Sequence, residues 1–380
     1  MTTSTTSTTL TTTTSVTTTP RRRVVLFAAA ILAASLGALT LGSASENLRG
    51  AESLPSRLSD QEFWRIVTDF SEPNGTFRSD NLLSNEMWLQ YVIPDLVRTA
   101  KSGRVYMGVG PEQNFTYISA LHPKISFIVD VRRGNRDLHL MYKALFELSG
   151  DRAEFVSRLF SKPRPEGLNS KSTIQQIIAG YWNVDTSESL YDDNLKAIRE
   201  TLLTKHKLPL TDEELKGIAD VYHAFFWHGP SINYSSSGNG FGGRSQPTYA
   251  DLMMATDGNG QARSYLASEE QYALIKELES KNLIVPVVGN FAGPKAIRAV
   301  GKYVREKGSV ISAFYLSNVE QYLMQDGLWR DFCRNVATLP IDETSRFIRA
   351  TRGGRYGAGY AYGLSSELGD MFAAVKSCDE

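Results

Sequence analysis

Two glycines and an aspartate form the first arrangement in this chain whose residue types and spacing could do chemistry. Gly108 and Gly110 follow the apolar run VYM, and Asp130 ends a second apolar run, ISFIVD, about twenty residues later. Glycines at the end of a strand let a ligand approach the backbone, and the next helix offers unpaired N–H groups. An acid at the end of the following strand can accept hydrogen bonds from ribose hydroxyls. These residues therefore predict a nucleotide-type cofactor site.

Two residues of the next helix extend this candidate site, and two alternatives compete with it. Glu112 and Asn114 lie in the first turn after Pro111, so we add both to the cofactor-binding residues. In one alternative, the glycines only allow a helix and a strand to pack closely, and Asp130 caps a turn. In the other, the ligand is NAD(P), although the dinucleotide fingerprint requires a third glycine where Gln113 stands.

The elements that must position these residues alternate between strands and helices. Apolar runs predict strands at 105–110, 125–131, 283–293 and 309–317. Amphipathic patterns predict helices at 59–70, 85–101, 111–121, 135–149, 266–282 and 293–308, and a helical insertion at 150–235. We therefore expect an α/β fold, with a mostly parallel, Rossmann-like sheet and helices on both faces.

The arrangement at 104–149 resembles the class I S-adenosylmethionine-dependent methyltransferase fold, and the strands at 283–317 resemble it more loosely. The resemblance implies S-adenosylmethionine as cofactor, with Gly108 and Gly110 along its methionine and ribose side and Asp130 on the ribose hydroxyls. Asn290 matches a position that often contacts the reacting group in that family. Tyr106 and Met107 stand where the family usually carries an acid.

The whole chain also resembles an uncharacterised bacterial family. The segments that carry this resemblance are SEPNGTFRSDNLLSNE, GVGPEQNF, VPVVGNFAGPKA and FYLSNVEQYL. Membership implies a methyltransferase-like fold without an established activity.

Further candidates for catalysis lie in the polar loop 71–86 and after two later strands. Asp80 and Glu86 could act as a general base or bind a metal, although helix caps and turns also use such residues. Asn290, Asn318 and Glu320 follow expected strands, and the carboxyl ends of strands are where open α/β sheets bind ligands. A metal-dependent hydrolase is therefore an alternative, although the histidines lack metal-ligand spacing and we assign no metal site.

The N-terminus differs in composition from the rest of the chain. Residues 1–20 are almost entirely Thr and Ser, which predicts disorder. Three arginines then precede the uncharged apolar segment 24–42, whose length is close to the ~20 residues of a membrane-spanning helix. We expect 21–42 to be a transmembrane anchor or a cleaved signal peptide, and 43–58 a linker. The positive-inside rule then places the folded domain outside the cytoplasm.

Composition limits the remaining choices. The 380 residues include 41 Lys and Arg and 41 Asp and Glu, and this balance argues against nucleic acid as the main partner. We expect one α/β domain at 59–350, a flexible loop at 231–247 and a Gly/Tyr-rich tail at 351–380. The sequence thus predicts a membrane-anchored or exported protein that binds a small ligand or nucleotide, with a methyltransferase as an alternative. Its oligomeric state stays open.

Overall fold

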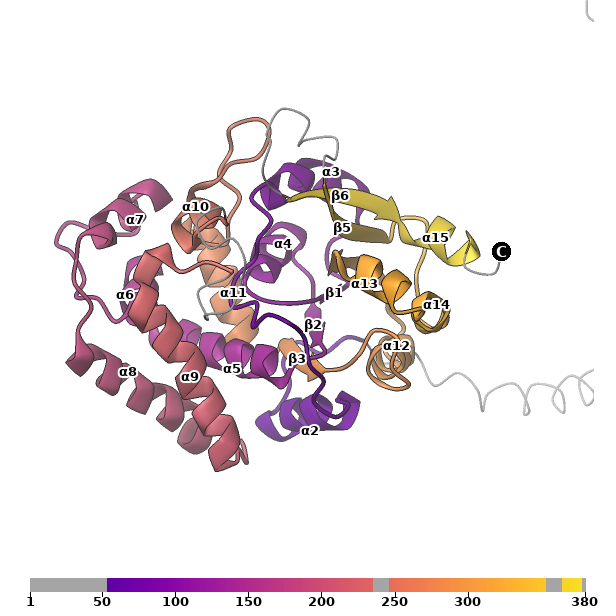
Figure 1. Cartoon of the computed structure of the whole chain (residues 1–380), viewed down its shortest axis with the longest axis horizontal. Coiled ribbons are helices and arrows are strands. Elements are labelled where there is room, and N and C mark those ends of the chain that lie inside the picture. Colours follow the sequence, from indigo (N-terminus) through magenta and orange to yellow (C-terminus); the bar gives the residue numbers. More distant parts are fainter. Residues whose placement is uncertain (1–52, 235–245, 353–363, 378–380) are drawn as a thin grey trace, which may run out of the picture. The chain divides into compact units, whose positions relative to one another are not determined.

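A six-stranded, mostly parallel sheet lies at the centre of the fold (Figure 1). Its strand order is β3-β2-β1-β4-β5-β6, and only β6 runs antiparallel to its neighbour. The computed structural model describes residues 53–234, 246–352 and 364–377. The strands are β1 (Val105–Gly108), β2 (Ile125–Asp130), β3 (Ile284–Val288), β4 (Ile311–Ser317), β5 (Arg346–Arg352) and β6 (Leu364–Asp370).

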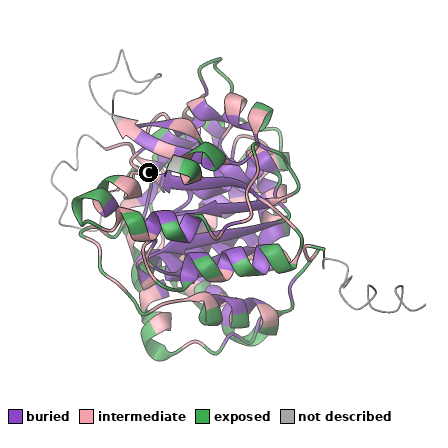
Figure 2. Ribbon diagram, turned by 90° about the vertical axis from the view of Figure 1, so that its right-hand side faces the viewer, coloured by how far each residue is buried: buried purple, intermediate pink, exposed green. Residues whose placement is uncertain are grey.

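The first four strands are the apolar runs of the sequence, and they are buried because helices cover both faces of the sheet. Figure 2 shows buried strands between helices whose outer sides are exposed. On one side lie α3 (Ile93–Thr99), α4 (Gln113–Leu121), α5 (Arg133–Leu148) and α11 (Glu269–Ser280) (Figure 1). On the other side lie α12 (Ala296–Glu306), α13 (Val319–Gln325) and α14 (Trp329–Val336). This arrangement confirms the predicted α/β fold.

The helices at the start of the chain and between α5 and α11 complete the described structure. Helix α2 (Asp60–Phe70) packs against β3, and the side chain of Ser59 caps its N-terminus. The predicted insertion is helical and extends to α10. Its elements are α6 (Arg152–Phe160), α7 (Ile174–Trp182), α8 (Glu188–Glu200), η2 (Thr201–Lys205), α9 (Asp212–His228), η3 (Gly229–Ser231) and α10 (Tyr249–Met254).

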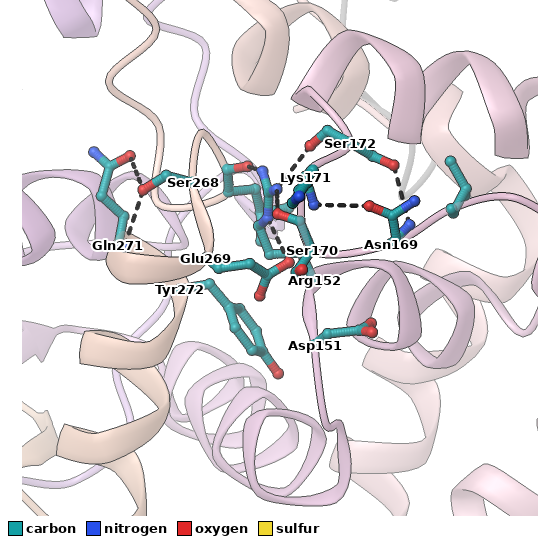
Figure 3. A network of polar contacts seen from close by, with 12 residues as sticks. Asp151, Arg152, Asn169, Ser170, Lys171, Ser172, Ser268, Glu269, Gln271 and Tyr272 are labelled. Atoms are coloured by element: carbon teal, nitrogen blue, oxygen red, sulfur yellow. Dashed lines mark hydrogen bonds and ion pairs between the residues drawn. The ribbon is translucent and has the colours of Figure 1, made fainter.

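A single buried arginine ties the insertion to α11 (Figure 3). Arg152, at the start of α6, donates to Glu269 Oε1 at 2.8 Å and to the carbonyl of Leu266 at 2.8 Å. Its remaining guanidinium nitrogen donates to the carbonyls of Ser172 and Ser170 at 2.7 and 3.2 Å. Four acceptors from three segments therefore share one side chain, which is 3 % exposed.

Three sequence-based expectations require correction. The helix predicted at 85–101 begins later, as η1 (Leu89–Val92) followed by α3, where Pro94 occupies the first turn. The strand predicted at 105–110 ends at Gly108, because the chain turns there. The predicted tail was wrong for 364–370, since β6 completes the sheet there, and the short helix α15 (Met371–Ser377) follows it.

Several expectations concern residues outside the described part of the chain. These are the Thr/Ser-rich segment, the apolar segment 24–42, most of the predicted loop at 231–247 and the centre of the Gly/Tyr-rich tail. Within the described residues, no helix is both long and apolar enough to cross a membrane. Leu58, the last residue of the predicted linker, is buried, and its N–H donates to the carbonyl of Lys281 at 3.0 Å.

Candidate functional site at the carboxyl edge of the sheet

Residues 71–88 form a strap that crosses the carboxyl edge of the sheet, where the parallel strands end. At β3, the N–H of Glu72 donates to the carbonyl of Val288 at 2.8 Å. At β2, the N–H of Gly75 donates to the carbonyl of Val131 at 2.9 Å. The strap therefore begins on the first two strands of the sheet, in their spatial order.

The second half of the strap continues along the same edge. Near β1, the N–H of Ser84 donates to Glu112 Oε1 at 3.4 Å. At β4, Glu86 accepts a hydrogen bond from Ser317, and at β6 Trp88 pairs with Ser365. The strap thus follows the order β3, β2, β1, β4 and β6 and omits only β5. It covers the place where open α/β sheets bind ligands.

The glycine turn after β1 is filled by side chains of the protein itself. The Asn114 amide donates to the carbonyls of Val109, Gly110 and Pro111 at 2.9, 3.2 and 2.7 Å. A Cβ on Gly108 would lie 1.9 Å from Asn114 Oδ1, and Gly110 has a φ of +76° that favours glycine. His139 Nε2 lies 2.9 Å from the Gly110 carbonyl. Internal packing alone is therefore sufficient to require both glycines.

Asp130 lies at the end of β2 as predicted, but an arginine holds its carboxylate. Arg132 Nε and Nη2 reach the two oxygens of Asp130 at 3.0 and 2.8 Å, and the Arg132 N–H adds a third bond at 2.9 Å. Arg132 also donates to the backbone carbonyls of Ser79 and Asp80 on the strap. A ribose would have to share Asp130 with Arg132 or displace it.

Glu86 is fully buried in a group of hydroxyls, which we call the Glu86 cluster and define as Glu86, Tyr117, Tyr315, Ser317 and Ser366. Ser317 and Ser366 donate to its two oxygens at 2.7 and 2.9 Å, and Tyr315 donates as well. Tyr117 lies 2.9 Å from Ser366. Burial raises the pKa of Glu86, although the three hydroxyl donors oppose this rise.

The backbone of Ser317 helps to form this cluster. Ser317 ends β4 with a φ of +51°, in the left-handed region that non-glycine residues seldom adopt. The register between β4 and β5 also shifts between Tyr315 and Ser317. The left-handed backbone and the register shift both lie where the Ser317 hydroxyl meets Glu86. They therefore position the Ser317 hydroxyl for this contact.

Glu112 lies beneath the strap, next to the glycine turn. Its side chain is buried, and burial raises its pKa to about 8, with a further contribution from the charge of Glu86. Glu112 Oε1 accepts from Ser84, but Glu112 Oε2 has no hydrogen-bond partner among the described residues. Glu112 is thus protonated near neutral pH unless a cation binds it.

Asn290 lies in the turn after β3, and the carboxylate of Glu72 binds the backbone of this turn. The Glu72 carboxylate accepts hydrogen bonds from the N–H groups of Asn290, Lys295 and Ala296 at 3.1, 2.8 and 2.9 Å. Glu72 therefore caps the beginning of α12, where an acid is favourable because it meets the positive end of the helix dipole. Asn290 Oδ1 accepts from the N–H of Ala292 at 2.9 Å, so it closes the turn.

The two candidate residues after β4, Asn318 and Glu320, have different roles. Asn318 precedes α13, and its side chain makes no capping hydrogen bond. Glu320 forms a two-point ion pair with Arg349 on β5, at 2.5 and 3.0 Å. Asp80 is exposed on the strap.

The structure thus places Glu112 under the end of the strap that carries Glu86, and it joins Asp130 to the strap through Arg132. Asn290 and Glu320 lie in separate contacts. Sequence reasoning did not foresee the contacts of three residues that decide this arrangement: Glu72, Arg132 and Tyr315. Only the contact of Arg132 had a signal in the sequence, because Arg132 lies two residues after Asp130 and can reach its carboxylate. Within the described ranges, no group of three or more His, Cys, Asp or Glu side chains could hold a metal ion.

A surface hollow of about 420 Å³ lies away from this edge. It is lined by Val97, Ala100, Lys101, Ser102, Ala120 and Leu121. These residues precede β1 and β2, so the hollow is at the opposite, amino-terminal edge of the sheet. Because α/β sheets bind their ligands at the carboxyl edge, we do not assign the ligand site to it.

Comparison with known proteins places the chain in a family. Residues 82–369 match the family described as a domain of unknown function, DUF7790. This match covers more than half of the chain and includes the second part of the strap, strands β1 to β5 and all of β6 except its last residue. The chain belongs to the DUF7790 family. No curated protein matches it.

Proposed function

We propose that this DUF7790 protein is a membrane-anchored or exported protein that binds a small nucleotide-type ligand at the carboxyl edge of a methyltransferase-like, Rossmann-like sheet. The strand order carries this proposal. Between β1 and β4 the order of connection reverses, and such a reversal opens the place where doubly wound sheets bind ligands. The glycine turn and Asp130 lie at the ends of two neighbouring strands there, as in S-adenosylmethionine-dependent methyltransferases.

Binding has more support than catalysis. Among the five candidate catalytic residues, Glu86 is enclosed by hydroxyls, Glu320 is paired with Arg349, and Asn290 closes a turn. A methyltransferase is the alternative, and it requires the strap to open over the Gly108–Gly110 turn. The metal-dependent hydrolase is a weaker alternative, because the described residues offer no ligand cluster.

A titration with S-adenosylmethionine and with its demethylated product tests the ligand. A ligand that binds only the folded state raises the free energy of unfolding, by about 2.7 kcal/mol at a hundredfold excess over Kd. We expect a higher Tm with either compound and binding heat in calorimetry. Unchanged Tm and no heat at saturating concentrations would rule out both compounds as ligands.

A pair of matched variants tests the position of the site. Asp130→Ala removes the predicted ribose acceptor at the carboxyl edge. Asp342→Ala removes a comparable ion-paired acid at the amino-terminal edge, where Asp342 meets Arg104 at 2.8 Å. We expect Asp130→Ala to weaken binding at least tenfold, whereas Asp342→Ala leaves Kd unchanged. Equal effects of the two variants would contradict a ligand at Asp130.

A further inference from the structure

Five buried polar atoms lack hydrogen-bond partners among the described residues near the beginning of α4 and α5. They are Glu112 Oε2, Gln113 Oε1, Asn135 Oδ1, His139 Nδ1 and the Tyr142 hydroxyl. Each of these residues is at most 2 % exposed. Buried polar groups almost always find a partner, because leaving one without a hydrogen bond is costly. Five in one region indicate that another molecule supplies the missing bonds.

These atoms belong to one interface. Asn135, His139 and Tyr142 are spaced four and three residues apart, so they share one face of α5. That face meets the beginning of α4, because His139 Nε2 lies 2.9 Å from the Gly110 carbonyl. The rings of His139 and Tyr142 lie 5.5 and 5.2 Å from that of Phe115 on α4.

The charge of Glu112 acts on the Tyr142 hydroxyl, although no hydrogen bond joins the two groups. Burial raises the pKa of the Tyr142 hydroxyl, and the negative charge of Glu112 raises it further, so the two groups interact electrostatically. Neither Glu112 Oε2 nor the Tyr142 hydroxyl has a hydrogen-bond partner in the described structure. A bridging molecule commonly satisfies buried polar groups that lack a direct hydrogen bond.

Most of these atoms are hydrogen-bond acceptors, so they favour a ligand that donates hydrogen bonds. The Gly110 carbonyl can only accept, so His139 Nε2 must carry its proton. Burial lowers the pKa of His139 to about 4, which leaves the neutral ring with Nδ1 as an acceptor at neutral pH. The Gln113 amide nitrogen donates to the Val109 carbonyl at 3.3 Å, which leaves its oxygen as a buried acceptor without a partner among the described residues. Glu112 adds a carboxylate when it ionises.

We propose that the interface between α4 and α5 binds a primary ammonium group among Glu112, His139 and Tyr142. An ammonium group supplies several N–H donors and a positive charge, which together match a carboxylate, a ring nitrogen and a hydroxyl. This site does not depend on a nucleotide ligand at the carboxyl edge. The ammonium group is either a free ion or the amino end of a larger molecule.

Salt-matched thermal unfolding of the full chain tests the proposal. Ammonium and methylammonium chloride should raise Tm above its value in sodium chloride, whereas tetramethylammonium, which has no N–H, should not. A larger effect of methylammonium than of ammonium would identify an amino group on a larger molecule, and the reverse would identify the free ion. Equal Tm values in all four salts would overturn the proposal and leave buried water as the occupant.

Two variants and a control locate the site. Glu112→Gln and Tyr142→Phe should each reduce the apparent ammonium affinity at least tenfold. Tyr303→Phe changes a buried tyrosine on α12, on the other side of the sheet, and should leave the ammonium effect intact. In a spectrum with ¹⁵N-labelled ammonium, the intact protein should show a signal protected from exchange, which Tyr142→Phe removes. An ammonium effect that survives both site variants would also overturn the proposal.

Discussion

At the scale of a single residue, burial of the Glu112 carboxyl group makes the free energy of unfolding depend on pH. Burial raises its pKa from 4.5 to about 8, so between these values the folded chain keeps a proton that the unfolded chain has lost. The unfolded state then binds fewer protons, and the free energy of unfolding falls as pH rises through this window. In sodium buffer, Glu112→Gln should match the parent protein below about pH 4.5 and exceed it by about 5 kcal/mol near pH 9.

Urea unfolding at several pH values measures this difference. Glu270, which is exposed on α11, provides the control, and Glu270→Gln should show no such pH dependence. Glu279 is also buried with a pKa raised to about 8, so Glu279→Gln should behave like Glu112→Gln. A difference between Glu112→Gln and the parent that stays constant with pH would show that folding does not shift the pKa of Glu112.

At this scale, the sequence predicts where a candidate site residue lies better than what it contacts. Asp130 ends β2 as expected, because the apolar run before it forms a strand. Its pairing with Arg132 depends on a side-chain conformation that spacing does not specify. Glu86 meets Tyr315, 229 residues later in the chain, and no local pattern could reveal that contact.

At the scale of elements, the strap depends on Glu86 for its hold on β4 and β6. Glu86→Gln replaces a carboxylate that accepts from three hydroxyls with an amide that has a single acceptor oxygen. We expect a loss of about 2 kcal/mol in the free energy of unfolding. Hydrogen exchange should accelerate in peptides covering 82–88 and stay unchanged in α12. Glu306→Gln, at an exposed position on α12, is the control, and slow exchange in 82–88 of Glu86→Gln would contradict this anchoring role.

Arg152 has a similar role for the insertion. Arg152→Ala leaves the half-buried Glu269 and three carbonyls without their donor, so we expect a loss of about 3 kcal/mol in the free energy of unfolding. Arg164 also forms an ion pair, with Asp151, but its side chain is 37 % exposed. Arg164→Ala should therefore cost less than about 1 kcal/mol. Chemical denaturation compares the two variants, and equal losses would mean that Arg152 does not tie the insertion to α11.

Strands with a continuous apolar run were predicted from the sequence, whereas a mostly polar strand was missed. Strands β1 to β4 were found because each is buried on both faces and reads as an unbroken apolar segment. Strand β6 was missed because its sequence, LSSELGD, is mostly polar and its buried residues include Ser365 and Ser366. Those serines are buried because they meet the strap and the Glu86 cluster, which are long-range contacts.

At the scale of the whole molecule, residues 1–51 are separable from the unit that begins at Glu52. The described part of that unit has its own sheet and core, so deletion of 1–51 should leave its Tm unchanged. The proposed anchor or signal at 24–42 should instead decide where the protein is found in the cell. A chain without 1–51 should stay in the cytoplasmic supernatant, whereas the full chain should reach the membrane or the extracytoplasmic side.

The fate of the N-terminus distinguishes an anchor from a signal. An anchor keeps the full mass and resists extraction by carbonate, because an apolar helix in the bilayer leaves only with detergent. A cleaved signal yields a shorter chain that starts after the small residues at 43–45. A C-terminal reporter that is active only outside the cytoplasm should respond in either case. If the full chain gave no response and stayed in the cytoplasmic supernatant, both interpretations of 24–42 would be wrong, and S-adenosylmethionine would be directly accessible to the carboxyl edge.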